Sequence, residues 1–170
     1  MRLFLALWPD PRARDALAEV ARSLAKLACG KPVPAAKIHL TLAFLGEVAP
    51  ERVDAVRDVA RSVRGAPFDL VLDAMGSFRK ARVAWVGSSR PPEQLVRLQS
   101  DLEAGLRARD FALEERPFAA HVTLARKVAL EVPPAAMAPI GWRAGEYVLA
   151  SSETGSGRYS ILEGWSLEGD

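Results

Sequence analysis

Residues 38–46 read Ile-His-Leu-Thr-Leu-Ala-Phe-Leu-Gly, and residues 121–126 read His-Val-Thr-Leu-Ala-Arg. Each stretch contains one of the two histidines in the chain, His39 and His121, with a threonine two positions later and a leucine after it. Successive side chains of a strand alternate between its faces. Each stretch therefore predicts a strand that presents an imidazole and a hydroxyl, Thr41 or Thr123, on one face and apolar side chains on the other.

The repetition of this pattern is its most informative property. The chain has only three threonines, and two of them stand at the same offset from the only two histidines. Random placement would produce both matches roughly once in a few thousand sequences. A single strand histidine would most simply be a half-buried structural residue, whereas the repeated pattern indicates one shared site.

Extended and helical patterns alternate along the rest of the chain. We predict strands over 2–8, 37–46, 68–75, 82–86, 118–127, 142–151 and 158–167, and helices over 11–28, 50–64 and 91–109. The proline-rich stretch 132–139 is interpreted as a loop. This order predicts an α+β fold with helices outside a central sheet system. The two motifs lie half a chain apart, which suggests two similar lobes within a single domain over residues 1–170.

Composition narrows the class of protein. Cys29 is the only cysteine, so an internal disulfide and a thiolate zinc cluster are both excluded, and a reducing cytoplasm is the expected setting. No apolar stretch is long enough to span a bilayer. The formal net charge is +2, and most basic residues are arginines, which favour a phosphate-bearing ligand, although any one arginine is more simply a solvated surface residue. We expect a monomer.

A pair of histidines suits the cleavage of a phosphodiester. One imidazole can take a proton from the nucleophile while the other gives a proton to the leaving oxygen, and each transfer contributes about 10²- to 10⁴-fold in rate. The threonine hydroxyls can donate to the non-bridging phosphate oxygens. A zinc site is the competing interpretation, but two histidines without neighbouring carboxylates supply too few ligands.

With these motifs identified, the chain resembles the two-histidine phosphoesterase superfamily, and within it the RNA 2′,3′-cyclic phosphodiesterase family, also called the 2′-5′ RNA ligase family. The resemblance also covers the segments 2–7, 78–85, 116–118 and 152–162. It implies two pseudo-symmetric lobes, each an antiparallel sheet backed by helices, around a central cleft.

The resemblance also implies an activity without a metal or other cofactor, hydrolysis of a 2′,3′-cyclic phosphate at an RNA end to a 2′-phosphate. His39 would be the proton donor to the 3′ oxygen and His121 the proton acceptor from water, and the roles would exchange in the reverse, ligating reaction. Thr41, Thr123 and Arg126 would bind the phosphate.

Some candidate contacts have two interpretations. Arg126 could neutralise the phosphate or be an ordinary strand-end arginine, because strict alternation places it on the face opposite Thr123. Phe44 could stack on a base or pack in the protein. The basic turn formed by Arg79, Lys80 and Arg82 could steer RNA or be simply solvated.

Two alternative functions remain open from the sequence. The same chemistry could act on a small cyclic nucleotide or on 2′-5′ oligoadenylate. The motifs could also belong to a non-catalytic nucleotide-binding module that uses them to recognise phosphate. Substrate choice would depend on loop residues outside the motifs, such as 31–37 and 78–82.

Overall fold

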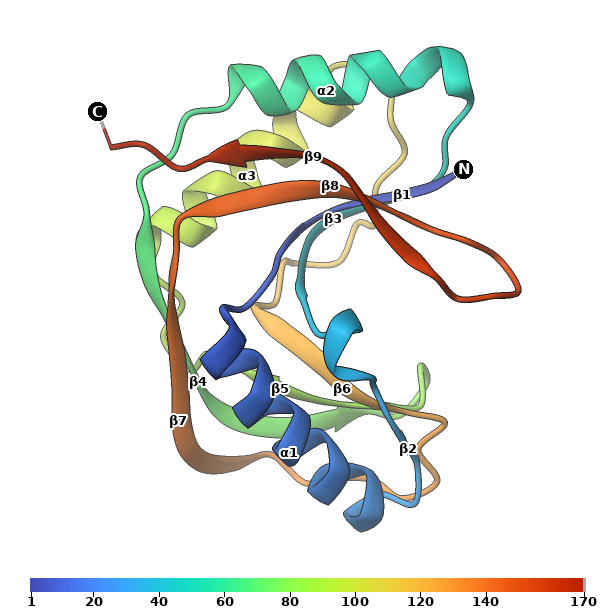
Figure 1. Cartoon of the computed structure of the whole chain (residues 1–170), viewed down its shortest axis with the longest axis vertical. Coiled ribbons are helices and arrows are strands. Elements are labelled where there is room, and N and C mark those ends of the chain that lie inside the picture. The colour runs from blue at the N-terminus through green and yellow to red at the C-terminus, as the bar shows by residue number, and fades with distance from the viewer. Residues whose placement is uncertain (170) are drawn as a thin grey trace.

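A computed structural model describes residues 1–169 of the chain (Figure 1). The α-helices are α1 (Pro11–Leu27), α2 (Val53–Ser62) and α3 (Glu93–Arg107), and short 3₁₀ turns are η1 (Ala35–Lys37) and η2 (Pro50–Arg52). The strands are β1 (Arg2–Leu7), β2 (Lys31–Pro32), β3 (Leu40–Glu47), β4 (Phe68–Phe78), β5 (Val83–Gly87), β6 (His121–Arg126), β7 (Ala135–Ala144), β8 (Glu146–Ser152) and β9 (Tyr159–Ser166).

The strands pair in the order β7-β4-β5-β6-β3-β1-β8-β9, with β2 beside β6, and every pairing is antiparallel. The central pairing of β3 with β6 consists of one residue pair, Leu40 with Val122. The sheet is therefore two sheets joined at one point. We call them the β3 lobe (β3, β1, β8, β9) and the β6 lobe (β7, β4, β5, β6, β2).

Helices cover the two lobes separately. Helix α1 contacts β6, β2 and β7, whereas α3 contacts β3 and α2 packs on α3. Figure 1 shows α1 beside the β6 lobe and the other two helices beside the β3 lobe. The predicted α+β class with two sheet-and-helix lobes is thus confirmed.

Alternation along β1 explains how one strand serves two environments. Leu3, Leu5 and Leu7 are fully buried in the main core, whereas Phe4 and Ala6 belong to a second, smaller apolar cluster. Adjacent side chains of a strand point to opposite faces, so the two clusters lie on opposite sides of the sheet. The leucine side faces the helices, and Phe4 lies on the opposite side, where the candidate site described below is found.

Helix α1 begins where the sequence predicts. The Asp10 carboxylate accepts a hydrogen bond from the backbone N–H of Ala13 at 2.8 Å, and Pro11 occupies the first turn, where a backbone donor is not needed. The buried stripe of the helix packs on the main core: Ala13, Leu17, Ala21, Leu24 and Ala25.

The region 132–151 differs from the prediction. Residues 135–139, predicted as part of a loop, belong to β7, and the predicted strand over 142–151 is divided at Gly145 between β7 and β8. Pro139 misled the interpretation, because proline cannot donate a ladder hydrogen bond. β7 is an edge strand, and its register with β4 shifts between Leu72 and Ala74, so Pro139 lies where a missing donor is tolerated.

Candidate active site

The single pair of strand-paired residues that joins the lobes coincides with the two motifs. Leu40 and Val122, which pair across the junction, each directly follow a histidine and are fully buried. His39 immediately precedes β3 and His121 begins β6, and both side chains are partly exposed. The antiparallel junction therefore brings the two imidazoles to one place. We call the side of the two sheets that carries them the histidine face.

Both motif strands contain a bulge just after the threonine. In β3 the register with β1 skips Leu42, and in β6 the register with β5 skips Leu124. A bulge adds one residue to its strand and thus restarts the alternation. In each strand the second residue after the skipped one, Phe44 in β3 and Arg126 in β6, is exposed, whereas the residue before it is buried. Both therefore lie on the histidine face.

Strict alternation, which would place Arg126 on the face opposite Thr123, is therefore interrupted in β6. Strict alternation fails because two consecutive buried residues, Leu124 and Ala125, separate Thr123 from Arg126. A second observation agrees, because the positive charge of Arg126 contributes to lowering the pKa of His39. The structure brings Arg126 together with both motifs.

Each imidazole is fixed by a backbone carbonyl two residues before it. The Nδ1–H of His39 donates to the carbonyl of Lys37 at 2.7 Å, and that of His121 donates to the carbonyl of Ala119, also at 2.7 Å. A carbonyl oxygen can only accept, so Nδ1 carries a hydrogen in both rings. Nε2 is therefore the atom that exchanges protons in each histidine.

The two Nε2 atoms differ in their partners. His39 Nε2 lies 3.1 Å from Thr41 Oγ1, within hydrogen-bond distance. Among residues 1–169 no protein partner of His121 Nε2 is found, and Thr123 makes no corresponding side-chain bond. We call each histidine, together with the side chains around it, a half-site. The two half-sites share one sequence pattern but are not equivalent.

His39 has a shifted proton affinity. Burial lowers the pKa of His39 below its usual value, and its hydrogen bond to the carbonyl of Lys37 opposes that change. The charges of Arg126 and His121 lower the pKa of His39 further, by smaller amounts. The two histidines and Arg126 are thus close enough to interact electrostatically.

Aromatic rings surround His39. The ring of Trp8 stacks on the imidazole at 5.0 Å and 21°, that of Phe4 lies at 5.0 Å, and that of Tyr159 lies edge-on at 5.6 Å. His121 has two edge-on neighbours, with ring centroids at 5.3 and 6.5 Å: Phe78 and Trp85. These neighbouring rings contribute to the burial of His39.

Sequence reasoning did not assign the aromatic neighbours of His39 to the site. For two of them a signal was present, because Phe4 and Trp8 fall at every second position of a segment whose other members are leucines. For Tyr159 no local signal exists. It reaches His39 only because β9 pairs with β8 and β8 pairs with β1.

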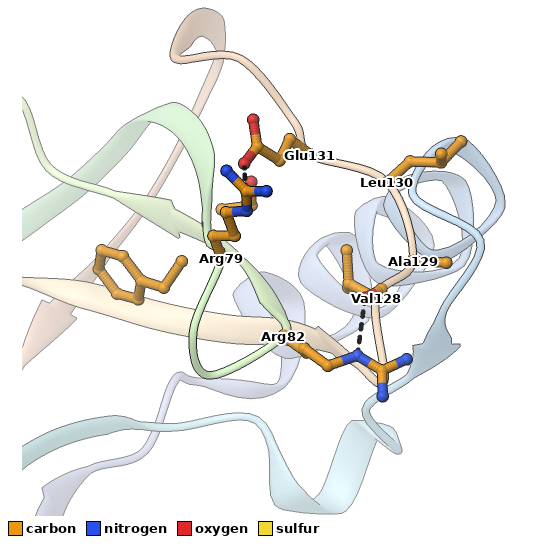
Figure 2. A pocket seen from close by; sticks show the side chains of 8 residues that line it. Arg79, Arg82, Val128, Ala129, Leu130 and Glu131 are labelled. Carbon is orange, nitrogen blue, oxygen red and sulfur yellow. Dashed lines mark hydrogen bonds and ion pairs between the residues drawn. The ribbon is translucent and has the colours of Figure 1, made fainter.

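The basic turn joins β4 to β5 and lies beside a pocket of about 520 Å³ (Figure 2). Arg79 and Arg82 line this pocket, and Lys80 is exposed in the same turn but is not one of the lining residues. In Figure 2 Arg79 extends toward Glu131, with which it forms an ion pair at 3.4 Å, while the Arg82 Nε–H donates to the carbonyl of Val128 at 3.2 Å.

Phe78 connects this pocket to the motifs. It lines the pocket, and its ring also contacts that of His121. The arginines of the turn thus lie next to the His121 half-site, and they do not contact the imidazoles themselves.

Neither a cluster of metal-ligating side chains nor a membrane-spanning helix is found within residues 1–169. No group of three or more His, Cys, Asp or Glu side chains in that range is placed to hold a metal ion. No helix in the same range combines the length and the apolarity that a membrane crossing requires.

Comparison with known proteins identifies the family. Residues 8–152 match the model of the 2′-5′ RNA ligase superfamily. An RNA 2′,3′-cyclic phosphodiesterase of Escherichia coli K12 is 33% identical over 98% of this chain and 96% of its own length.

Solved structures agree with these sequence matches. The crystal structure of E. coli LigT with 3′-AMP superposes with a TM-score of 0.88 at 33% identity, covering 98% of this chain and 97% of that chain. A Thermus thermophilus structure has a TM-score of 0.85 at 32% identity and covers 100% of both chains. The two motifs, the two lobes and these similarities lead to one conclusion: this chain belongs to the 2′-5′ RNA ligase superfamily, in the family of the RNA 2′,3′-cyclic phosphodiesterases.

Proposed function

We propose that this protein hydrolyses the 2′,3′-cyclic phosphate at an RNA end to a 2′-phosphate and a free 3′-hydroxyl, using His39 and His121 without a metal. The observation that carries the proposal is the pair of imidazoles at the lobe junction, each held through Nδ1 with Nε2 left for proton exchange. The names of the relatives support the substrate, and the E. coli relative crystallised with 3′-AMP supports nucleotide binding.

In the proposed step one bond to phosphorus forms, another breaks, and two protons move. His121 Nε2 takes a proton from water, and the water oxygen forms a bond to phosphorus. The bond from phosphorus to the 3′ oxygen breaks, and His39 Nε2–H gives its proton to that oxygen. Each proton transfer is typically worth about 10²- to 10⁴-fold in rate. The resemblance assigns the two roles, and the acid role requires that His39 be protonated when substrate is bound.

Substrate binding can supply that proton affinity. The pKa of His39 is lowered by burial and by the positive charge of Arg126. A bound phosphate places negative charge beside both groups, which offsets the charge of Arg126 and favours the protonated imidazole. We propose that Arg126, Thr41 and Thr123 hold the non-bridging oxygens while this occurs.

Cleavage and formation of a 2′-5′ linkage would use the same groups as the hydrolysis. If the 2′-linked phosphate is attacked by the neighbouring 3′-hydroxyl while a 5′-hydroxyl departs, a 2′-5′ linkage is broken and the cyclic phosphate is reformed. Its microscopic reverse, ligation, joins a cyclic end to a 5′-hydroxyl that takes the place of water, so His121 is again the base and His39 the acid. The exchange of roles expected from the resemblance therefore applies to cleavage of the 2′-5′ linkage and not to ligation. We propose that this chain shares that capacity with the superfamily whose model it matches.

Product identity tests the proposal. RNA ending in a 2′,3′-cyclic phosphate is incubated with the protein, and ³¹P NMR distinguishes the 2′-phosphate from the 3′-phosphate product. We expect the 2′-phosphate, with about 10²- to 10⁴-fold lower kcat in His39→Ala and in His121→Ala. Thr154→Val, at the only threonine outside the motifs, is the matched control and should turn over normally. A 3′-phosphate product, or normal turnover by either histidine variant, would overturn the proposal.

A further inference from the structure

A row of side chains crosses all four strands of the β3 lobe on the histidine face. Phe44 of β3 pairs with Phe4 of β1, Phe4 pairs with Ala150 of β8, and Ala150 pairs with Ile161 of β9. Directly paired residues point to the same face of a sheet. Phe4 and Ala150 are buried in the small apolar cluster, whereas Phe44 is 40% exposed and Ile161 is 59% exposed.

This row is continuous with the His39 half-site. The ring of Phe4 lies 5.0 Å from that of His39 and 5.3 Å from that of Tyr159, and Tyr159 itself contacts His39. Aromatic rings therefore connect the imidazole to the buried Phe4, whose partner on the neighbouring strand is the exposed Phe44.

A positive charge accompanies the exposed end of the row. The guanidinium of Arg2 lies 5.4 Å from the centre of the Phe44 ring, in a cation–π arrangement, and Arg2 is exposed. An exposed aromatic ring beside a cation on an open sheet face is the combination that single-stranded nucleic acid binds, with a base on the ring and a phosphate at the cation.

The reaction geometry decides which lobe the RNA chain follows. In an in-line displacement the entering and leaving oxygens lie on opposite sides of phosphorus. With His121 at the entering water and His39 at the leaving 3′ oxygen, the ribose lies on the His39 side. The chain that continues from the 5′ oxygen of that ribose therefore begins over the β3 lobe, and the pocket beside Arg79 lies on the other side.

From these observations we propose that Phe44 and Arg2 form a subsite for the nucleotides upstream of the cyclic end, with a base stacked on Phe44 and a phosphodiester bound by Arg2. The inference rests on the proposed function for its direction. Phe44 lies beyond Phe4, which contacts the His39 ring at 5.0 Å and pairs with Phe44, so a base on Phe44 is farther from the reacting phosphate than a base beside Phe4. The subsite would make the protein prefer RNA to a mononucleotide.

The test compares substrates of different length. kcat/KM is measured for a mononucleotide 2′,3′-cyclic phosphate and for a five-nucleotide RNA with the same end. Phe44→Ala should lower kcat/KM for the RNA about 5- to 150-fold more than for the mononucleotide, the range expected for loss of one stacked base. Phe44→Trp should retain the preference. Val96→Ala, an exposed apolar residue on α3, is the control and should change neither value.

A salt series tests the role of Arg2. Arg2→Ala should reduce the slope of log kcat/KM against log salt for the RNA by about one, because one phosphate contact is lost. An unchanged slope would overturn the assignment of Arg2.

Three results would overturn the subsite. The wild type could treat both substrates alike, Phe44→Ala could lower both values equally, or Arg79→Ala could abolish the length preference that Phe44→Ala leaves intact. In the third case the chain would run over the β6 lobe.

A binding measurement separates this inference from the proposed function. Fluorescence anisotropy with a five-nucleotide RNA ending in a 2′-phosphate requires no turnover. If wild type binds it more tightly than Phe44→Ala does, the subsite stands even where hydrolysis fails. If the two bind equally, the subsite is refuted even where hydrolysis occurs.

Discussion

Thr41→Val is the substitution for which the geometry makes the sharpest prediction. Thr41 Oγ1 lies 3.1 Å from His39 Nε2. When His39 is neutral, the hydroxyl donates to Nε2. When His39 is protonated, Nε2 can no longer accept, and the hydroxyl hydrogen becomes free to donate to a phosphate oxygen. Thr41 can therefore stabilise the phosphate only in the protonation state that His39 needs as the acid.

The magnitude follows from the loss of that one donor. Removing a single hydrogen-bond donor from developing oxyanion charge lowers kcat by about 10²- to 10³-fold. Valine keeps nearly the same shape, and one neutral hydrogen bond contributes about 0.5–1.5 kcal/mol to stability. We expect the free energy of unfolding of Thr41→Val to fall by no more than about that amount, so the variant folds.

Single-turnover kinetics and a double-mutant cycle test the coupling. Because Thr41 acts through its bond with His39, combining Thr41→Val with His39→Ala should cost much less than the sum of the single effects. Thr123 makes no such bond among the described residues, so Thr123→Val with His39→Ala should be closer to additive. A wild-type kcat for Thr41→Val, or full additivity in its cycle, would refute this reasoning.

Three other predictions address the same site. Because burial lowers the pKa of His39, and an acid must be protonated, kcat/KM should fall as pH rises through a value below the usual 6.5 or so of histidine. Trp8→Leu, which exposes His39, should move this limb to higher pH, whereas a limb that stays in place would refute the role of burial. Activity should survive dialysis against EDTA, and its loss followed by recovery with an added divalent ion would show a metal requirement. Gly76→Ala should lower kcat, because a Cβ there would lie 2.5 Å from the ring of Trp85, which borders His121; unchanged kcat with an unchanged circular dichroism spectrum would show that this packing is unimportant.

The sequence was informative where local periodicity decides the outcome. The offset of two between His39 and Thr41, and between His121 and Thr123, predicts a shared face, and the structure places each pair on the histidine face. The three helices follow from apolar residues at helical spacing. These features depend on residues that are close together in the chain, so a single sequence is enough to predict them.

The features that escaped prediction depend on partners distant in the chain. The face on which Arg126 lies is set by a bulge, which is visible only in the register between β5 and β6. Tyr159 reaches His39 through two intervening strand pairings. β7 escaped because its proline, Pro139, is tolerated at a sheet edge or a bulge, and a sequence does not state where either lies.

The central claim is that His39 is the acid and His121 the base in one metal-free step, and a sulfur substitution tests it most directly. In an RNA 2′,3′-cyclic phosphate whose 3′ bridging oxygen is replaced by sulfur, the leaving thiolate needs no proton, because thiols ionise near pH 8.5. His39→Ala should then lose about 10²- to 10⁴-fold on the oxygen substrate but approach wild-type kcat on the sulfur substrate. His121→Ala should be equally impaired on both. Recovery by His121→Ala instead, or by neither variant, would contradict the assignment.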